Sequence, residues 1–70
     1  MKNHPAINSS EEKILFLIKG GLTNNNIAKV LGKSEDTIKY HLKRIYRKLG
    51  VNNRIEAINE FNNLIKNNRL

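Results

Sequence analysis

The side chains best suited to binding chemistry lie between residues 34 and 49 of this 70-residue chain. Five of them recur at intervals of three and four residues and would share one face of a helix: Asp36, Lys39, Tyr40, Lys43 and Arg47. Lysine donates hydrogen bonds to guanine O6 and N7, and a tyrosine ring can contact a thymine methyl group. This polar ridge of cations around an aromatic ring therefore fits a DNA groove.

The opposite side of the same stretch is apolar and predicts packing against a core. Its members follow at spacings of four, three and four residues: Ile38, Leu42, Ile45 and Leu49. Ser34 can cap the start of such a helix, and Gly50 can end it. The pattern therefore predicts a helix over residues 35–49, with the apolar stripe buried and the polar ridge outside.

The net charge of +7 comes from 13 Lys and Arg side chains against six Asp and Glu side chains, and it predicts attraction to polyanions. The cations gather in the middle of the chain: Lys33, Lys39, Lys43, Arg44, Arg47, Lys48 and Arg54. A run of this kind is often only a solvated helix face, and charge by itself leaves that alternative open. Because the charge coincides with the polar ridge, the pattern favours nucleic acid as the partner.

The composition argues against catalysis, metal binding and export. The chain has no cysteine, its only histidines are His4 and His41, and no carboxylate pair stands in an evident pocket. His41 is expected to pack beside the apolar stripe. No apolar run approaches the roughly 20 residues that cross a bilayer, and no signal-peptide pattern opens the chain. We therefore expect a cytoplasmic protein that is not an enzyme and needs no metal or cofactor.

Two further helices are predicted before the ridge. Asn8 and Glu11 have the spacing of a capping box, and the apolar residues that follow extend a helix over about residues 9–19. Thr23 can cap a shorter helix of about two turns that runs to Leu31.

The second and third predicted helices have the layout of a helix-turn-helix, because only Gly32 and Lys33 separate them. Ala28, in the middle of the second helix, would let the third helix cross close to it. Alanine is also simply a good helix former, so this residue supports the layout without requiring it.

A fourth helix is predicted over about residues 54–66, because Asn53 and Glu56 have capping-box spacing and an apolar face follows them. Residues 1–6 are expected to be flexible and residues 67–70 to fray. The chain thus predicts one all-α domain over residues 7–66, with four helices and no strand.

Many residues at fixed offsets across these four helices form one pattern. They are Gly21 to Ala28 (GLTNNNIA), Leu31, Ser34, Thr37 to Lys39, His41, Ile45, Lys48 to Val51 (KLGV), Arg54, Glu56 and Ala57. This pattern resembles the LuxR-type (GerE-like) helix-turn-helix domain over about residues 7–65. The resemblance implies a winged-helix-like fold without the wing, in a transcription regulator whose third helix enters the major groove of double-stranded DNA. Met1 and the lack of a linker favour a stand-alone regulator over an excised fragment, associated with the bacterial nucleoid when DNA-bound.

The resemblance places the base contacts on Lys39, Tyr40 and Lys43, with Asp36 and Arg47 at the two ends of the ridge. Tyr40 stands where the family often has a small aliphatic residue, so the operator cannot be inferred from relatives. Another departure, Lys33, lies at a commonly aliphatic turn position and is expected to loosen the turn.

Contacts to the DNA backbone are expected from a second set of residues: Thr23, Asn24, Asn25, Thr37, Arg44, Arg47 and Lys48. Hydroxyls, amides and the free N–H groups at a helix start suit phosphate oxygens, although helix capping uses the same groups. Lys48 is expected to be the strongest of the cations. Arg54 is also expected to contact the backbone, and the alternative for this residue is a structural ion pair with Glu11 or Glu56.

The predicted fourth helix carries more apolar surface than one small core needs. In the family the corresponding helix is a dimer contact, which implies a homodimer on a two-fold operator with half-sites ~34 Å apart. The expected interface residues are Ile55, Ile58, Phe61, Asn62 and Ile65. Internal packing of the whole arc is the alternative. RNA polymerase is a further expected partner. The alternative function is that of an adaptor, which pairs with another regulator and binds DNA weakly.

Overall fold

The computed structural model describes residues 7–67 and contains four helices over that range. They are α1 (Ser9–Lys19), α2 (Asn24–Leu31), α3 (Glu35–Leu49) and α4 (Arg54–Lys66). These bounds agree with the four predicted ranges and confirm the all-α fold class. The expected flexibility of residues 1–6 and most of the expected fraying at 67–70 lie outside the described residues, while Asn67 forms the turn that follows α4.

Polar caps explain where the first three helices begin. Asn8 and Glu11 form the predicted reciprocal capping box, with N–H to side-chain oxygen distances of 2.8 and 3.1 Å. Thr23 accepts a hydrogen bond from the N–H of Asn26, and Ser34 caps α3 in the same way. Each cap satisfies a backbone donor that the helix itself leaves without a partner.

The start of α4 differs from the prediction in one half of its cap. The Asn53 side chain accepts from the N–H of Glu56 at 2.9 Å, as expected. The Glu56 carboxylate, however, accepts from the N–H of Asn52 instead of Asn53. The helix still begins where predicted, because the cap that fixes its first turn is the Asn53 side chain.

Glycines end α2 and α3 with the same backbone geometry. Gly32 and Gly50 adopt left-handed conformations with φ of 68° and 72°, a region that residues with a Cβ rarely enter. After α2, the N–H of Lys33 donates to the carbonyl of Ala28 at 2.9 Å. The turn expected to be loosened by Lys33 is therefore closed by a Schellman hydrogen bond.

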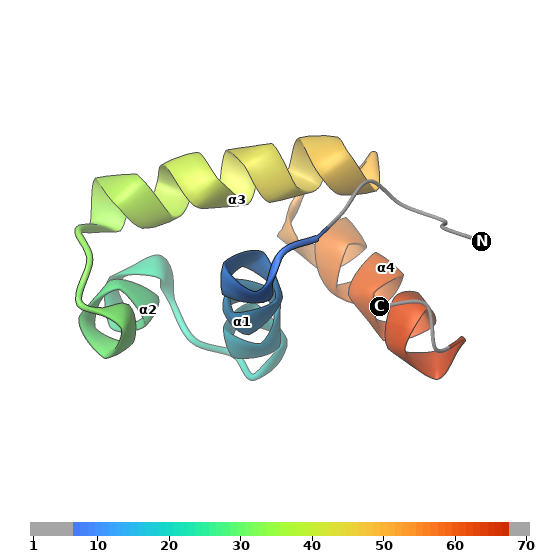
Figure 1. The fold of residues 1–70 in the computed structure, drawn as a ribbon, viewed down its shortest axis with the longest axis horizontal. Helices are drawn as coiled ribbons and strands as arrows, with labels where there is room; N and C mark the ends of the chain where they lie inside the picture. Colours follow the sequence, from blue (N-terminus) through green and yellow to red (C-terminus); the bar gives the residue numbers. More distant parts are fainter. Residues whose placement is uncertain (1–6, 68–70) are drawn as a thin grey trace.

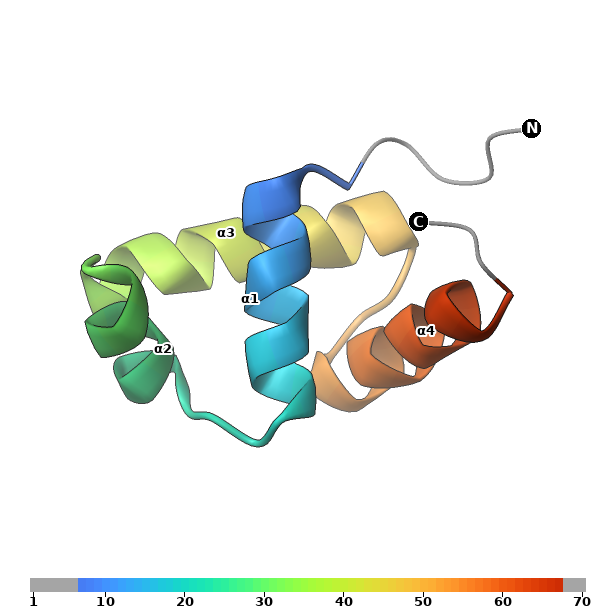
Figure 2. The same ribbon diagram turned by 60° about the horizontal axis from the view of Figure 1, so that its bottom comes forward.

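Helix α3 spans one side of the molecule, and the other three helices lie beneath it with α1 between α2 and α4 (Figure 1). Figure 2 shows α1 crossing α3, its N-terminal turn close to the longer helix. The core between them is built from one face of each helix: Ile14, Leu15, Ile18, Ile27, Ala28, Ile38, Leu42, Ile45, Leu49, Ala57, Phe61 and Leu64. The predicted apolar stripe of α3 is thus confirmed as core, and Ala28 is buried where α2 packs on α3.

Phe61 was expected on the pairing face of α4, and the structure corrects that assignment. Its side chain has no exposed surface. Its ring meets the ring of Phe16 edge to face, with centroids 4.8 Å apart. Phe61 therefore joins α4 to α1 inside the chain, where the inward side of α4 packs against α1.

No helix within the described range is long and apolar enough to cross a bilayer.

Candidate nucleic-acid interface

The polar ridge lies on the side of α3 that faces away from the other helices. All five of its residues are exposed, and Tyr40 keeps 59% of its surface accessible. Since the stripe on the other side of α3 is buried, the amphipathic division predicted for this helix is confirmed. The ridge is free to meet a partner along more than two helical turns.

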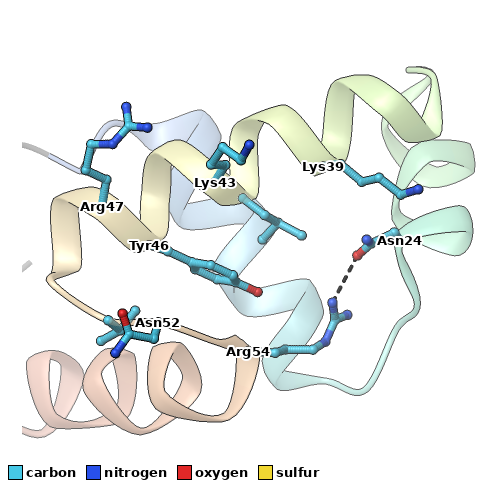
Figure 3. Close-up of a pocket in the computed structure, with 9 residues that line it drawn as sticks. Asn24, Lys39, Lys43, Tyr46, Arg47, Asn52 and Arg54 are labelled. Carbon is cyan, nitrogen blue, oxygen red and sulfur yellow. Dashed lines mark hydrogen bonds between the residues drawn. The ribbon is translucent and has the colours of Figure 1, made fainter.

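A hollow of about 470 Å³ adjoins the ridge, and we call it the α2–α4 hollow. Its lining comes from the start of α2, one flank of α3 and the segment that enters α4: Asn24, Lys39, Leu42, Lys43, Tyr46, Arg47, Val51, Asn52 and Arg54 (Figure 3). These nine residues include four cations and no carboxylate. Such a lining attracts anions, because nothing in it opposes the positive field.

Arg54 organises the far wall of the α2–α4 hollow. Its Nη1 donates to Oδ1 of Asn24 at 2.9 Å (Figure 3). Its Nη2 donates to the backbone carbonyl of Leu22. The structural role considered for Arg54 was an ion pair with Glu11 or Glu56. The guanidinium instead fixes the start of α2, and because it occupies Oδ1 of Asn24, it leaves the Asn24 amide nitrogen as a donor.

The other two residues at the start of α2 keep polar groups near the surface. Thr23 and Asn25 are exposed. The Thr23 oxygen accepts from Asn26, so its hydroxyl hydrogen is still available to an acceptor. The Asn25 amide makes a long 3.5 Å contact to Glu35. Capping and anion binding are thus compatible at this helix start.

Lys48, which is expected to be a phosphate contact, forms an ion pair within the fold. Its Nζ lies 2.9 Å from both carboxylate oxygens of Glu11, which joins α3 to the first turn of α1. A lysine held in this way is less suited to be the leading phosphate contact. The capping-box spacing identified Glu11 as a cap, but no local signal connects it with a lysine 37 residues away.

Burial and charge act in opposite directions on Glu11. Burial favours the neutral acid, yet the hydrogen bond from Lys48, the N–H of Asn8 and the positive field of Lys48 and Arg44 together hold the pKa of the Glu11 carboxyl below its usual value. Glu11 therefore carries its charge inside the fold, compensated by these donors.

Of the remaining predicted backbone contacts, Arg47 lines the α2–α4 hollow, whereas Arg44 lies on the flank of α3 that faces α1. Thr37 is half-buried and shares a hydrogen bond of 2.8 Å with the Ser34 hydroxyl. Arg44 is half-buried, and its guanidinium carbon lies 5.9 Å from the centroid of the Tyr40 ring. Tyr40 therefore supports a cation on this flank in addition to being part of the ridge.

The outer side of α4 carries most of the residues expected at a dimer interface. Ile55 is 72% exposed, Asn62 and Ile65 are also exposed, and Ile58 is half-buried. These four follow at intervals of three, four and three residues and form one stripe along the helix, which we call the α4 seam. Phe61, buried in the core, is not part of it.

Comparisons with known proteins agree with this geometry. Residues 9–61 match the GerE family model, described as bacterial regulatory proteins of the luxR family. The chain is 44% identical to the probable transcriptional regulatory protein SgaR of Hyphomicrobium methylovorum, over 80% of this chain and 28% of that protein. It is 38% identical to the CsgBAC operon transcriptional regulatory protein of Escherichia coli K12, over 80% of this chain and 26% of that protein.

A solved structure shares the whole arrangement of helices. The crystal structure of the response regulator ChrA, from a heme-sensing two-component system, superposes with a TM-score of 0.81 and 38% sequence identity. The match covers 99% of this chain and 33% of that one. The chain thus spans about a third or less of the proteins that it is compared with here.

Proposed function

Because the chain belongs to the luxR family of bacterial regulatory proteins, we propose that it is a sequence-specific DNA-binding regulator of transcription. The observation that carries the proposal is the exposed ridge of α3, which has a basic hollow beside it and a buried stripe behind it. A helix with these two sides can enter the major groove, which is about 12 Å wide, while the rest of the fold holds it at a fixed angle.

In this proposal the ridge reads bases and the start of α2 binds the backbone. Lys39, Tyr40 and Lys43 contact base edges, since all three are exposed along the middle of α3. Asn24 donates to a phosphate oxygen at the α2–α4 hollow, where Arg54 fixes its amide. Regulation follows from occupancy of a promoter, either by contact with RNA polymerase or by excluding it. Such occupancy would place the protein on the nucleoid.

Selection of bound sequences from a random double-stranded library tests this function. Enrichment of one motif is expected, and its symmetry and spacing would define the operator. On that operator, Lys39→Ala and Lys43→Ala should each weaken binding by ~1–3 kcal/mol, because each removes a donor to a base edge.

Lys19→Ala provides the control for these two variants, since Lys19 is exposed in the last turn of α1 and lies outside the ridge. It should change operator affinity far less than either ridge variant. Equal affinity of the wild type and both ridge variants for the operator would contradict the assigned reading helix.

We further propose that the protein binds its operator as a homodimer through the α4 seam. The apolar seam residues Ile55 and Ile65 are exposed in the single chain, and association would remove their apolar surface from water. A two-fold pair of chains would set two α3 helices on half-sites about one helical turn, ~34 Å, apart.

The exposure of Ile55 also favours a second candidate, an adaptor that pairs with another regulator and binds DNA weakly. Light scattering of the free protein, combined with the library selection, separates the two functions. A specific motif bound by two copies supports the regulator. A stable hetero-complex without any enriched motif supports the adaptor.

A further inference from the structure

A second hollow lies on the other flank of α3, and we propose that it binds a phosphate of the DNA strand opposite to the one at the α2–α4 hollow. This inference rests on the proposed function. The second hollow measures about 410 Å³ and lies between the start of α1, the turn after α2 and α3. We call it the α1–α2 hollow. Lys13, Lys33, His41 and Arg44 contribute to its lining, together with Ser10 and Glu11.

Helix geometry places the two hollows on opposite flanks of α3. Lys39 and Lys43 line the first hollow, whereas His41 and Arg44 line the second. Successive residues turn by about 100° around a helix, so positions 39 and 41 project roughly 200° apart. Asp36 and Tyr40 of the polar ridge lie between the two flanks, with the buried stripe on the opposite side of the helix.

The charges around the α1–α2 hollow suit an anion. Lys13 and Lys33 are exposed, and Arg44 is half-buried. The only carboxylate in the lining belongs to Glu11, which is 4% exposed and held by Lys48 and by the N–H of Asn8. Its negative charge is compensated within the fold, so the lysines and the arginine dominate the field at the mouth of the hollow.

The dimensions of DNA favour a phosphate as the occupant. A helix with its side chains is about 10–12 Å across and fills a major groove about 12 Å wide, so a sugar–phosphate backbone passes along each side of it. Arg44 connects this flank with the ridge, because its guanidinium lies against the ring of Tyr40. One strand then meets the α2–α4 hollow and the other strand meets the α1–α2 hollow.

The inference assigns phosphate binding to Lys13 and Lys33, two residues that the sequence pattern did not identify as DNA contacts. Lys13 lies on the outer side of α1, and Lys33 occupies a turn whose backbone is already closed by the hydrogen bond from its N–H to Ala28. Both side chains are therefore free to serve as phosphate donors without altering the helix ends.

The test compares two double variants with the same net charge. In the first, Lys13→Gln and Lys33→Gln remove the two lysines of the α1–α2 hollow. In the control, Lys19→Gln and Lys66→Gln remove two exposed lysines from the last turns of α1 and α4. Binding to a mixed-sequence duplex is followed by fluorescence anisotropy over a series of salt concentrations, because phosphate contacts do not depend on sequence.

The slope of log affinity against log salt should become shallower by about 0.9 in the first variant, since the two lysines hold one phosphate and each lost phosphate contact removes about 0.9. The control should keep the slope of the wild type. If the wild type binds with a steep salt dependence and the two double variants have equal slopes, the inference is overturned and the proposed function is left intact. Salt-independent binding by the wild type would overturn the proposed function as well.

A scan of neutral methylphosphonate linkages along both strands of the selected operator locates the strand. Some neutral linkages should weaken DNA binding by the wild type and by the control but not by the Lys13→Gln, Lys33→Gln variant. These linkages identify the phosphates that contact the α1–α2 hollow. Within each half-site of the operator, they should lie on the strand opposite to those that Asn24→Ala makes insensitive. Finding both sets on the same strand within one half-site would reject the phosphate assignment. Polyglutamate binding that requires Lys13 and Lys33, together with an unchanged DNA slope, would also reject it.

Discussion

Glu11 shows how much of this small fold can depend on one side chain. Among the described residues it is the buried charged one, and its carboxylate accepts from the N–H of Asn8 in the capping box of α1 and from Lys48 twice. The carboxylate therefore connects the start of one helix with the end of another. Removing one partner of such a pair leaves the other desolvated and unsatisfied, which is the costly outcome for a buried polar group.

Substitution of Glu11 should produce a pH-dependent loss of stability. Glu11→Gln is expected to lower the free energy of unfolding at neutral pH by about 1–3 kcal/mol, as measured by urea denaturation. Because its pKa is lowered in the folded chain, the Glu11 carboxylate contributes stability above its ordinary pKa of about 4.5, and this contribution is lost as the pH falls through the folded value. The variant should therefore lose less stability than the wild type on acidification below about pH 4.5.

Glu12→Gln serves as the matched control, because it neutralises the neighbouring carboxylate in the same helical turn and leaves the Lys48 pair in place. It should retain most of the acid dependence of the wild type. Parallel pH profiles for the wild type and Glu11→Gln would contradict the role given to the buried carboxylate.

At the scale of the elements, the glycines after α2 and α3 decide where each helix stops and how the chain turns. Gly50 has a φ of 72°, and the N–H of Val51 returns to the carbonyl of Tyr46 at 3.0 Å. This geometry starts the short connection that leads to Asn52 and Arg54, both of which line the α2–α4 hollow. The end of α3 is thus part of what shapes the interface.

Two glycine substitutions should distinguish the effect of backbone conformation on stability from the effect of the space available for a side chain. Gly50→Ala is expected to destabilise the fold by ~1–2 kcal/mol, because an added Cβ disfavours the left-handed region even though no atom lies within 4 Å of it. Gly20→Ala should be neutral or stabilising by ~0.4–1 kcal/mol, since Gly20 has an ordinary φ of −76°. Its added Cβ would lie 3.4 Å from the nearest atom, the Phe16 carbonyl oxygen.

Thermal and urea unfolding of both alanine variants measures this difference. If Gly50→Ala proved as stable as Gly20→Ala, the end of α3 would not depend on the left-handed conformation.

At the scale of the whole molecule, the residues of α4 are divided between the core and the exposed α4 seam. Phe61 fills the space beside α1, whereas Ile55 and Asn62 point to the surface. The inner side of α4 therefore contributes to folding of the single chain, and the α4 seam is the side that we propose for association. Substitutions on the inner side should therefore change the stability of the single chain, and substitutions in the α4 seam should change binding of two copies to the operator.

Phe61→Ala should destabilise the monomer by about 3–5 kcal/mol, because it leaves a cavity where a large ring was fully buried. Ile55→Asn should change monomer stability by only about 0.5 kcal/mol, as an exposed substitution. It should, however, raise the protein concentration needed to fill both half-sites of the operator, since the α4 seam loses its most exposed apolar residue.

Val30→Asn is the control for the seam variant, because Val30 is 61% exposed on α2 and lies outside the seam. Quantitative gel-shift titrations should show two-copy occupancy unchanged in this variant and weakened in Ile55→Asn. The same two-copy occupancy in both variants would place the dimer contact elsewhere.

The sequence by itself determined the helices and the two sides of α3. Asn8, Thr23, Ser34 and Asn53 signal the four helix starts through bonds that reach only three residues along the chain. The spacing of the apolar residues then separates the buried stripe from the polar ridge. Such signals are readable in a sequence because cap and periodicity both act within one or two turns.

Only the tertiary structure decided which polar groups meet across the fold. Lys48 forms an ion pair with Glu11 at a separation of 37 residues, and Arg54 donates a hydrogen bond to Asn24 at a separation of 30. Both pairings depend on how the helices cross, as do the burial of Phe61 and the two hollows beside α3. Crossing angles follow from the packing of whole helix faces, so no short stretch of sequence contains them.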